Sequence, residues 1–352
     1  MSSASSRTYQ PHLDLLRIFA AFCVILLHVL APLHGSAADF GTRTWHAANL
    51  LNEITRTGVP LFLMLTGCLL LPSASTKNFG AFYRRRLSRV LLPFLVWNLI
   101  YYVYNRTQNG LPVIDRAFFD QLINNGSEYH FWYVYTLIGI YLLLPFLARM
   151  LEGCTNNQIL WLLILTTFPS TLRPLLNITT PVYIFLFNPL LEGYLGYVIL
   201  GHYLNRLPKT RITAAAIPVC GIAGFAIGVG FNYFRSAPGA LDLMFNGGYT
   251  INHYLLASAF FLLARFLPMP ASGAFSRILQ KLSSLTYTVY LAHVLVLAQL
   301  YKYLPLPTPA WQIAVYPVVC FLLCMLLAFV LDLVKTALLR LLPSKAKQTE
   351  TK

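Results

Sequence analysis

The stretch LDLLRIFAAFCVILLHVLAPL, residues 13–33, is long and apolar enough to cross a bilayer as one helix. Its ionisable groups include two that lie farther into the span and that a lipid-facing helix would avoid, Arg17 and His28. At about 100° per residue, a spacing of eleven residues returns both to nearly the same helix face, roughly 16 Å apart along the axis. Because an ionisable side chain inside a membrane is costly, this face predicts a functional site.

The composition of the whole chain is that of a membrane protein. Hydrophobic residues make up 57% and charged residues 11%, and the mean hydropathy is +0.62. Soluble proteins carry about a quarter charged residues. We expect an all-α, polytopic membrane protein, a single bundle of about ten transmembrane helices, at residues 13–33, 52–72, 87–105, 130–150, 158–172, 182–201, 212–231, 250–268, 283–303 and 311–334.

The basic residues predict how this bundle is oriented. Most of the 26 Lys and Arg residues fall on the side that holds the N-terminus, the even-numbered loops and the C-terminus. The positive-inside rule therefore places both termini in the cytoplasm. The net charge of +15 then reflects topology, with anionic membrane lipid as a secondary partner and no nucleic-acid partner expected.

The connections between the predicted spans are short, so we expect one membrane domain at residues 13–335, between a short cytoplasmic tail at 1–12 and a basic cytoplasmic tail at 336–352. Small residues follow the first span, as they do at signal-peptide cleavage sites. Its apolar run is longer than a usual signal-peptide core and contains ionisable residues, so we expect it to be retained as a helix.

Two interpretations remain open for the first span. His28 either hydrogen-bonds a neighbouring helix, as polar residues in membrane bundles often do, or acts in catalysis. Asp14 precedes Arg17 by three residues, so the two side chains can neutralise each other at the membrane edge. This pair is a candidate interfacial clamp as well as part of a site.

A second candidate site is the basic run YRRRLSRVLLPF, residues 83–94. Such a run is typical of a topology anchor on the cytoplasmic side. Arg85, Arg86 and Arg89 also lie within about one turn of each other at the start of a predicted helix. Clustered guanidinium groups match phosphate oxygens, so the run predicts a binding site for a phosphorylated cytoplasmic ligand.

Further candidate residues lie in other spans. Arg56 is at the outer end of the second span, and the simplest interpretation of this span is ordinary helix packing. His130 opens the fourth span, where Trp132 and Tyr133 are placed as in an aromatic belt. His293, with Tyr290 three residues before it, and Glu192 lie within spans. The spacing of the six cysteines predicts neither a disulfide framework nor a metal site.

These motifs, in this order, resemble the membrane acyltransferase family three, whose members O-acetylate cell-surface polysaccharides and related glycans. The resemblance covers essentially the whole chain and is closest to the short enterobacterial-common-antigen type. This chain has Thr66 where the family often has Ser, and it lacks the C-terminal esterase-like domain of longer relatives. The resemblance rests on Arg17-x10-His28, Val59-Pro60-Leu61-Phe62 running to Thr66-Gly67, Arg86-x-x-Arg89 with Pro93-Phe94, His130-Phe131-Trp132-Tyr133 and Tyr290-x-x-His293.

The resemblance implies an O-acetyltransferase in the bacterial inner (plasma) membrane that uses acetyl-CoA as donor substrate and has no permanently bound cofactor. Its acceptor would be a surface glycan or lipid-linked oligosaccharide, with polysaccharide assembly proteins as further partners. His28 would be a general base or an acyl carrier, beside Arg17 and Asp14. Arg85, Arg86 and Arg89 would hold the donor phosphates, and the acceptor side would comprise His130, Trp132, Tyr133, Arg56, Tyr290, His293 and Glu192.

Two other function classes remain open. A secondary transporter of a sugar or lipid-linked glycan, with His and Glu as a proton relay, fits the size and the number of spans. The absence of a convincing internal repeat and the one-sided arginine cluster argue against it. A structural or assembly partner of a polysaccharide machine is the third class.

Overall fold

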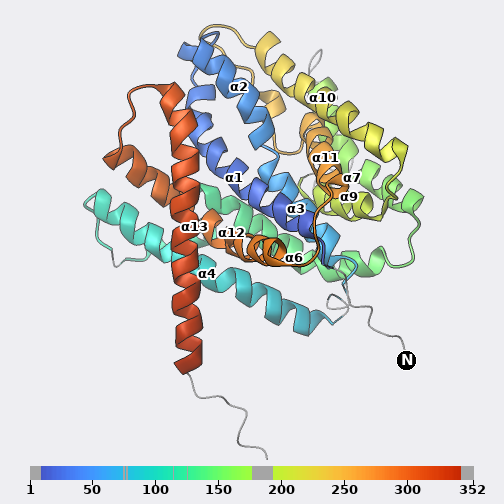
Figure 1. Ribbon diagram of the computed structural model, residues 1–352. Helices are drawn as coiled ribbons and strands as arrows, with labels where there is room; N and C mark the ends of the chain where they lie inside the picture. The colour runs from blue at the N-terminus through green and yellow to red at the C-terminus, as the bar shows by residue number, and fades with distance from the viewer. Residues whose placement is uncertain are drawn as a thin grey trace, which may run out of the picture.

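The structure is a bundle of helices, most of them long and apolar (Figure 1). It is a computed structural model and describes residues 9–73, 76, 78–113, 115–124, 126–176 and 193–341. These ranges contain no β-strand, which confirms the predicted all-α class. The helices are α1 Pro11–His34, α2 Arg43–Thr55, α3 Gly58–Leu70, α4 Phe79–Gln108, α5 Ala117–Asn124, α6 Trp132–Met150, α7 Asn156–Leu176, α9 Leu195–Arg206, α10 Arg211–Phe234, α11 Ile251–Phe266, α12 Ala274–Tyr303 and α13 Pro309–Leu341.

Within the described ranges, seven helical segments are long and apolar enough to cross a membrane, and the chain is thus a multi-pass membrane protein. They are Pro11–His34, Arg43–Leu70, Phe79–Gln108, Tyr129–Met150, Arg211–Phe234, Ala274–Tyr303 and Pro309–Arg340. Of the other predicted spans, 158–172 falls within α7 and 250–268 corresponds to the shorter apolar helix α11. Most of the predicted span at 182–201 lies outside the described residues, and α9 covers its end.

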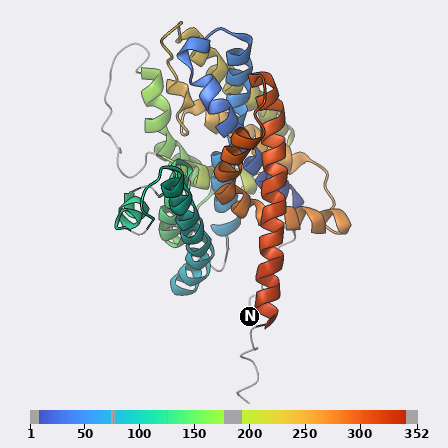
Figure 2. The ribbon, with the colours of Figure 1, turned by 90° about the vertical axis from the view of Figure 1, so that its left-hand side faces the viewer.

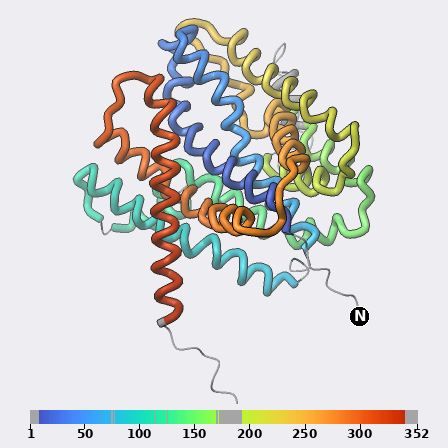
Figure 3. Tube along the Cα trace, in the orientation of Figure 1, coloured from blue at the N-terminus to red at the C-terminus, as the bar shows by residue number. Residues whose placement is uncertain are grey.

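The central helix of the bundle is α1, which packs against α2, α3, α11, α12 and α13 (Figures 1 and 3). Pro11 opens it at a position where a missing N–H costs no hydrogen bond, and Asp14 in the first turn complements the helix dipole. Pro32 lacks the N–H that would bond the carbonyl of His28 one turn earlier. Figure 2 shows α13 at the margin, extending past one end of the bundle.

The predicted second span is two helices that meet at Arg56 and Thr57. The backbone N–H of Arg56 donates to the carbonyls of Asn52 and Ile54 and ends α2. Pro60 lies in the first turn of α3, where proline is tolerated. Gly58 brings α3 against α1, because a Cβ there would lie 2.9 Å from the carbonyl oxygen of Ala20. The break therefore places the Arg56 side chain inside the bundle.

Candidate active site

Arg17 is held between α1 and α12 by a polar triad. Its Nη1 atom lies 2.8 Å from Oδ1 of Asp14 and donates to Oγ of Ser283 at 2.7 Å. The Ser283 hydroxyl in turn donates to the same Asp14 oxygen at 2.5 Å. Ser283 is 266 residues from Arg17 in the sequence and was not among the predicted site residues.

A cavity of about 700 Å³, here called the arginine cavity, opens beside this triad. Arg17 from α1, Arg86 and Arg89 from α4 and Ser283 from α12 line it. The structure thus brings together two arginine groups that are about 70 residues apart in the sequence. Arg85 is exposed outside the lining of this cavity, and its Nε donates to the carbonyl of Ala81 at 3.1 Å.

Two tyrosines, Tyr133 and Tyr290, form part of the wall of the arginine cavity. Their ring centroids are 5.2 Å apart and their planes are at 70°. The Tyr290 hydroxyl donates to the backbone carbonyl of His130. Its backbone carbonyl accepts a hydrogen bond from Nδ1 of His293 at 2.5 Å. Tyr290 therefore joins the cavity to two of the predicted site histidines.

The three site histidines form one cluster, although they come from α1, from the short 3-10 helix Tyr129–Phe131 and from α12. The ring centroid of His293 lies 5.0 Å from that of His28 and 4.9 Å from that of His130. His130 and His293 are buried, and His28 is half-buried. Because Nδ1 of His293 donates to a carbonyl, the neutral ring has its lone pair on Nε2.

Tyr129, which was not predicted from the sequence, also contacts the cluster. Its hydroxyl oxygen lies 3.2 Å from Nδ1 of His28. Tyr129 also lines a second cavity of about 350 Å³, here called the loop cavity, between the end of α4, α5 and the loop before α6. The loop cavity is lined by Tyr102, Asn105, Arg106, Gln121, Gly126, Ser127, Glu128 and Tyr129.

The two cavities lie toward opposite ends of α4. Arg86 and Arg89 are near its first turns, whereas Tyr102 and Arg106 are near its last. Sixteen residues from Arg86 to Tyr102 correspond to roughly 24 Å of helix, most of the thickness of the hydrocarbon core. Tyr290 lines one cavity and contacts His130 and His293, whereas Tyr129 lines the other and contacts His28.

Arg56 and Trp132 lie outside the histidine cluster. Nη1 of Arg56 donates to the backbone carbonyl of Asn246 at 2.7 Å. The ring of Trp132 lies 5.1 Å from that of Tyr194, at the start of α9. Glu192 is outside the described residues.

Arg56 belongs to a buried polar network that the sequence analysis missed. Asn49, Asn52, Glu53 and Arg56 have the i, i+3, i+4, i+7 spacing of one helix face, which was the available signal. Oε1 of Glu53 accepts from Nδ2 of Asn252 at 2.7 Å. The same oxygen lies 3.6 Å from Nε2 of His253, and neither side chain is exposed to solvent. This network fixes α2 against α10 and α11.

A family model described as an acyltransferase domain matches residues 11–329, which include α1 and most of α13. No curated protein matches the chain, and no solved structure does.

Proposed function

Because the chain belongs to the acyltransferase 3 family, we propose that it is an integral membrane O-acyltransferase. It moves an acetyl group from acetyl-CoA to a hydroxyl of a cell-surface polysaccharide or lipid-linked glycan. One observation carries this proposal: Tyr290 lines the same cavity as three arginines, and it also contacts two of the three histidines that form one cluster.

The arginine cavity is the donor site in this proposal. Arg86 and Arg89 bind the phosphates of acetyl-CoA, because guanidinium groups donate paired hydrogen bonds to phosphate oxygens. The narrow pantetheine arm passes Arg17 and extends toward Tyr290. Tyr133 and Tyr290, which form part of the cavity wall, then lie beside the thioester.

The acceptor hydroxyl approaches through the loop cavity. Its lining of amide, hydroxyl and carboxylate side chains is typical of a sugar site, and Tyr129 connects it to His28. Entry of donor and acceptor from opposite ends of α4 agrees with a cytoplasmic donor and a surface glycan. Both termini are then cytoplasmic, and the protein resides in a bacterial inner membrane, as in the enterobacterial-common-antigen type.

The chemical step uses His28 as general base. Its Nε2 takes the proton of the acceptor hydroxyl as that oxygen attacks the thioester carbonyl carbon. The carbon–sulfur bond then breaks, and the leaving thiolate takes the proton from the imidazolium to give CoA. In the acyl-carrier route, Nε2 of His28 first attacks the thioester carbonyl carbon, and the carbon–sulfur bond breaks to release the CoA thiolate. The acceptor hydroxyl then attacks the acetyl-imidazolium, its proton passes to the thiolate, and the neutral imidazole is regenerated.

The test is acetyl transfer by the purified full-length protein in lipid vesicles. The donor is acetyl-CoA with a labelled acetyl group, and the acceptor is surface glycan from cells in which this gene is deleted. We expect label in the glycan with the wild-type protein and with the control His46→Ala, an exposed histidine on α2, but none with His28→Ala. Transfer by His28→Ala at the wild-type level would remove this histidine from the chemistry. If the wild-type protein labels neither the glycan nor itself, the result would favour a transporter.

A further inference from the structure

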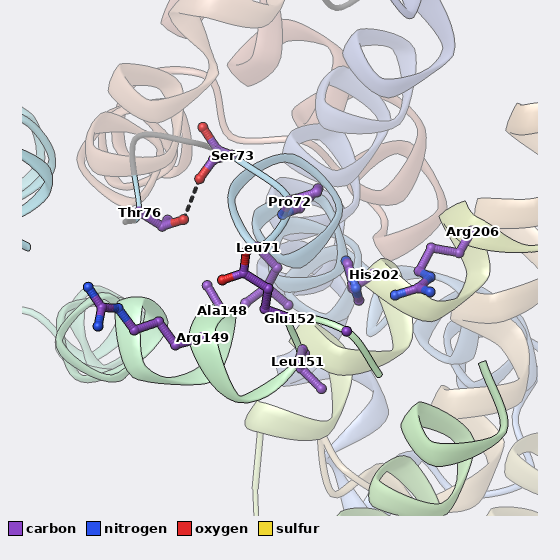
Figure 4. Close-up of a pocket in the computed structure, with 11 residues that line it drawn as sticks. Leu71, Pro72, Ser73, Thr76, Ala148, Arg149, Leu151, Glu152, His202 and Arg206 are labelled. Carbon is purple, nitrogen blue, oxygen red and sulfur yellow. Dashed lines mark hydrogen bonds between the residues drawn. The ribbon is translucent and has the colours of Figure 1, made fainter. Parts of the chain in front are cut away.

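A third cavity, of about 240 Å³, lies where α6 ends, beside the chain that leaves α3 and one face of α9 (Figure 4). We call it the α9 cavity. Leu71, Pro72 and Leu151 give it apolar walls, and Glu152, His202 and Arg206 give it polar groups. None of these residues belongs to the proposed transfer chemistry.

The polar groups of the α9 cavity come from α9 and from the residues after α6. Figure 4 shows the side chains of His202 and Arg206 projecting from α9 toward the cavity, with Glu152 opposite them. His202 is only 7% exposed, and its Nε2 has no hydrogen-bond partner among the described residues. Nη2 of Arg206 donates to the carbonyl of Cys154 at 3.1 Å, which holds the guanidinium at the rim. A buried ring nitrogen without a partner is costly, so it points to a ligand.

The α9 cavity continues the arginine cavity. Ser73 lines both of them. Tyr133, Leu137 and Tyr141 of α6 line the arginine cavity, and Ala148 and Glu152 line the α9 cavity. The spacings of four and seven residues keep the first four on one stripe of α6, and Glu152 follows in the turn after its end. From Tyr141 to Ala148 the helix advances about 10 Å. A single elongated ligand that follows α6 therefore contacts both cavities.

We propose that the α9 cavity binds the adenosine 3′-phosphate end of the donor, an inference that rests on the proposed use of acetyl-CoA. A nucleotide is the ligand class that this mixture of groups fits. Apolar walls accept the faces of a purine, a carboxylate accepts from its exocyclic amine, and Arg206 binds the ribose phosphate. A simple anion would be repelled by Glu152, and an apolar ligand would leave His202 without a partner.

The test compares two donors that differ in the adenosine 3′,5′-bisphosphate unit, which comprises the part assigned to this cavity and one of the phosphates assigned to Arg86 and Arg89. Acetyl-CoA carries the nucleotide, whereas acetyl-4′-phosphopantetheine keeps the thioester, the pantetheine arm and one phosphate. Transfer rates are measured with full-length wild-type protein, His202→Ala, Arg206→Ala and the control Arg211→Ala, an exposed arginine outside the cavity lining. Activity with the truncated donor also shows that each variant is folded.

We expect the KM for acetyl-CoA to rise about tenfold in His202→Ala and in Arg206→Ala, with the KM for the truncated donor unchanged. Adenosine 3′,5′-bisphosphate should compete with acetyl-CoA in the wild type and in Arg211→Ala, and about tenfold more weakly in the two cavity variants. Equal KM changes for both donors, or a wild type that uses both donors equally well, would overturn the nucleotide site while leaving the transferase intact. Failure of the wild type to use either donor would instead overturn the proposed function, and this inference with it.

Discussion

The phenol oxygen of Tyr129 lies 3.2 Å from Nδ1 of His28, so a residue of the short 3-10 helix before α6 and a residue of α1, about 100 positions apart, share one hydrogen bond. A neutral imidazole carries its proton on one nitrogen only. If Nδ1–H donates to the phenol oxygen, Nε2 keeps its lone pair and can accept a proton from a hydroxyl. This is the tautomer that the proposed general base requires, with the Tyr129 oxygen as acceptor.

Replacing Tyr129 by Phe removes this hydrogen bond and keeps the ring. We expect Tyr129→Phe to lower kcat for acetyl transfer by about 10- to 100-fold, because His28 then populates both tautomers. The KM for acetyl-CoA should stay the same, since Tyr129 lies outside the lining of the arginine cavity. Initial rates over a range of acetyl-CoA concentrations give both constants. Tyr303→Phe, at an exposed tyrosine, is the control, and a wild-type kcat in Tyr129→Phe would contradict the assignment.

The three arginines of the basic run differ in position, and this difference predicts different kinetics. Arg86 and Arg89 line the arginine cavity, whereas Arg85 lies outside its lining. A hydrogen bond to a charged group contributes about 1.5–3 kcal/mol. We therefore expect Arg86→Ala and Arg89→Ala each to raise the KM for acetyl-CoA at least about tenfold, with little change for Arg85→Ala. Equal effects at all three positions would show that they act only as a diffuse charge.

The arginine run also shows what the sequence can and cannot predict. Its position at the start of a helix follows from the apolar residues after it. Which arginines face the cavity depends on helix phase, since one residue turns the side chain by about 100°. The Asp14–Arg17 pair is local and was predictable, whereas Ser283 joins it only through the packing of α1 on α12.

The same distinction applies to the fold. Apolar runs predicted the long helices, but the break between α2 and α3 at Arg56 interrupts a run that is apolar throughout its second half. The polar face from Asn49 to Arg56 can be seen in the sequence, but its hydrogen-bond partners cannot. They come from α10 and α11, where Asn232 donates to Asn49 and Asn252 donates to Glu53. Hydropathy averages over such a face, so it misses buried polar networks.

Glu53 anchors that network, and its removal should destabilise the bundle. Glu53→Leu deprives the Asn252 amide of its carboxylate acceptor, whereas Glu53→Gln retains a side-chain oxygen for it. We expect the leucine variant to lose about 1–3 kcal/mol of folding free energy and the glutamine variant to lose less. Size-exclusion chromatography after heating in detergent gives a melting temperature for the wild type and for each of the two variants, and these temperatures rank the three proteins. A leucine variant as stable as the wild type would show that the network contributes nothing to folding.

The contact between α3 and α9 predicts a second and larger stability effect. A Cβ at Gly67 would lie 1.8 Å from the carbonyl oxygen of Val198, and one at Gly201 would lie 2.0 Å from that of Met64. Both obstacles are backbone atoms, so the helices must move apart to accept a methyl group. Overpacking of this kind costs about 1–3 kcal/mol or more.

We therefore expect Gly67→Ala and Gly201→Ala each to lower the melting temperature, and the acetyl-transfer rate with it, because α3 also forms part of the wall of the arginine cavity. Gly139→Ala on α6 is the matched control, since a Cβ there meets no described atom within 4 Å. Alanine favours a helix over glycine by about 1 kcal/mol, so this control should be at least as stable as the wild type. Equal melting temperatures for all three variants would mean that α3 and α9 are farther apart than the structure places them.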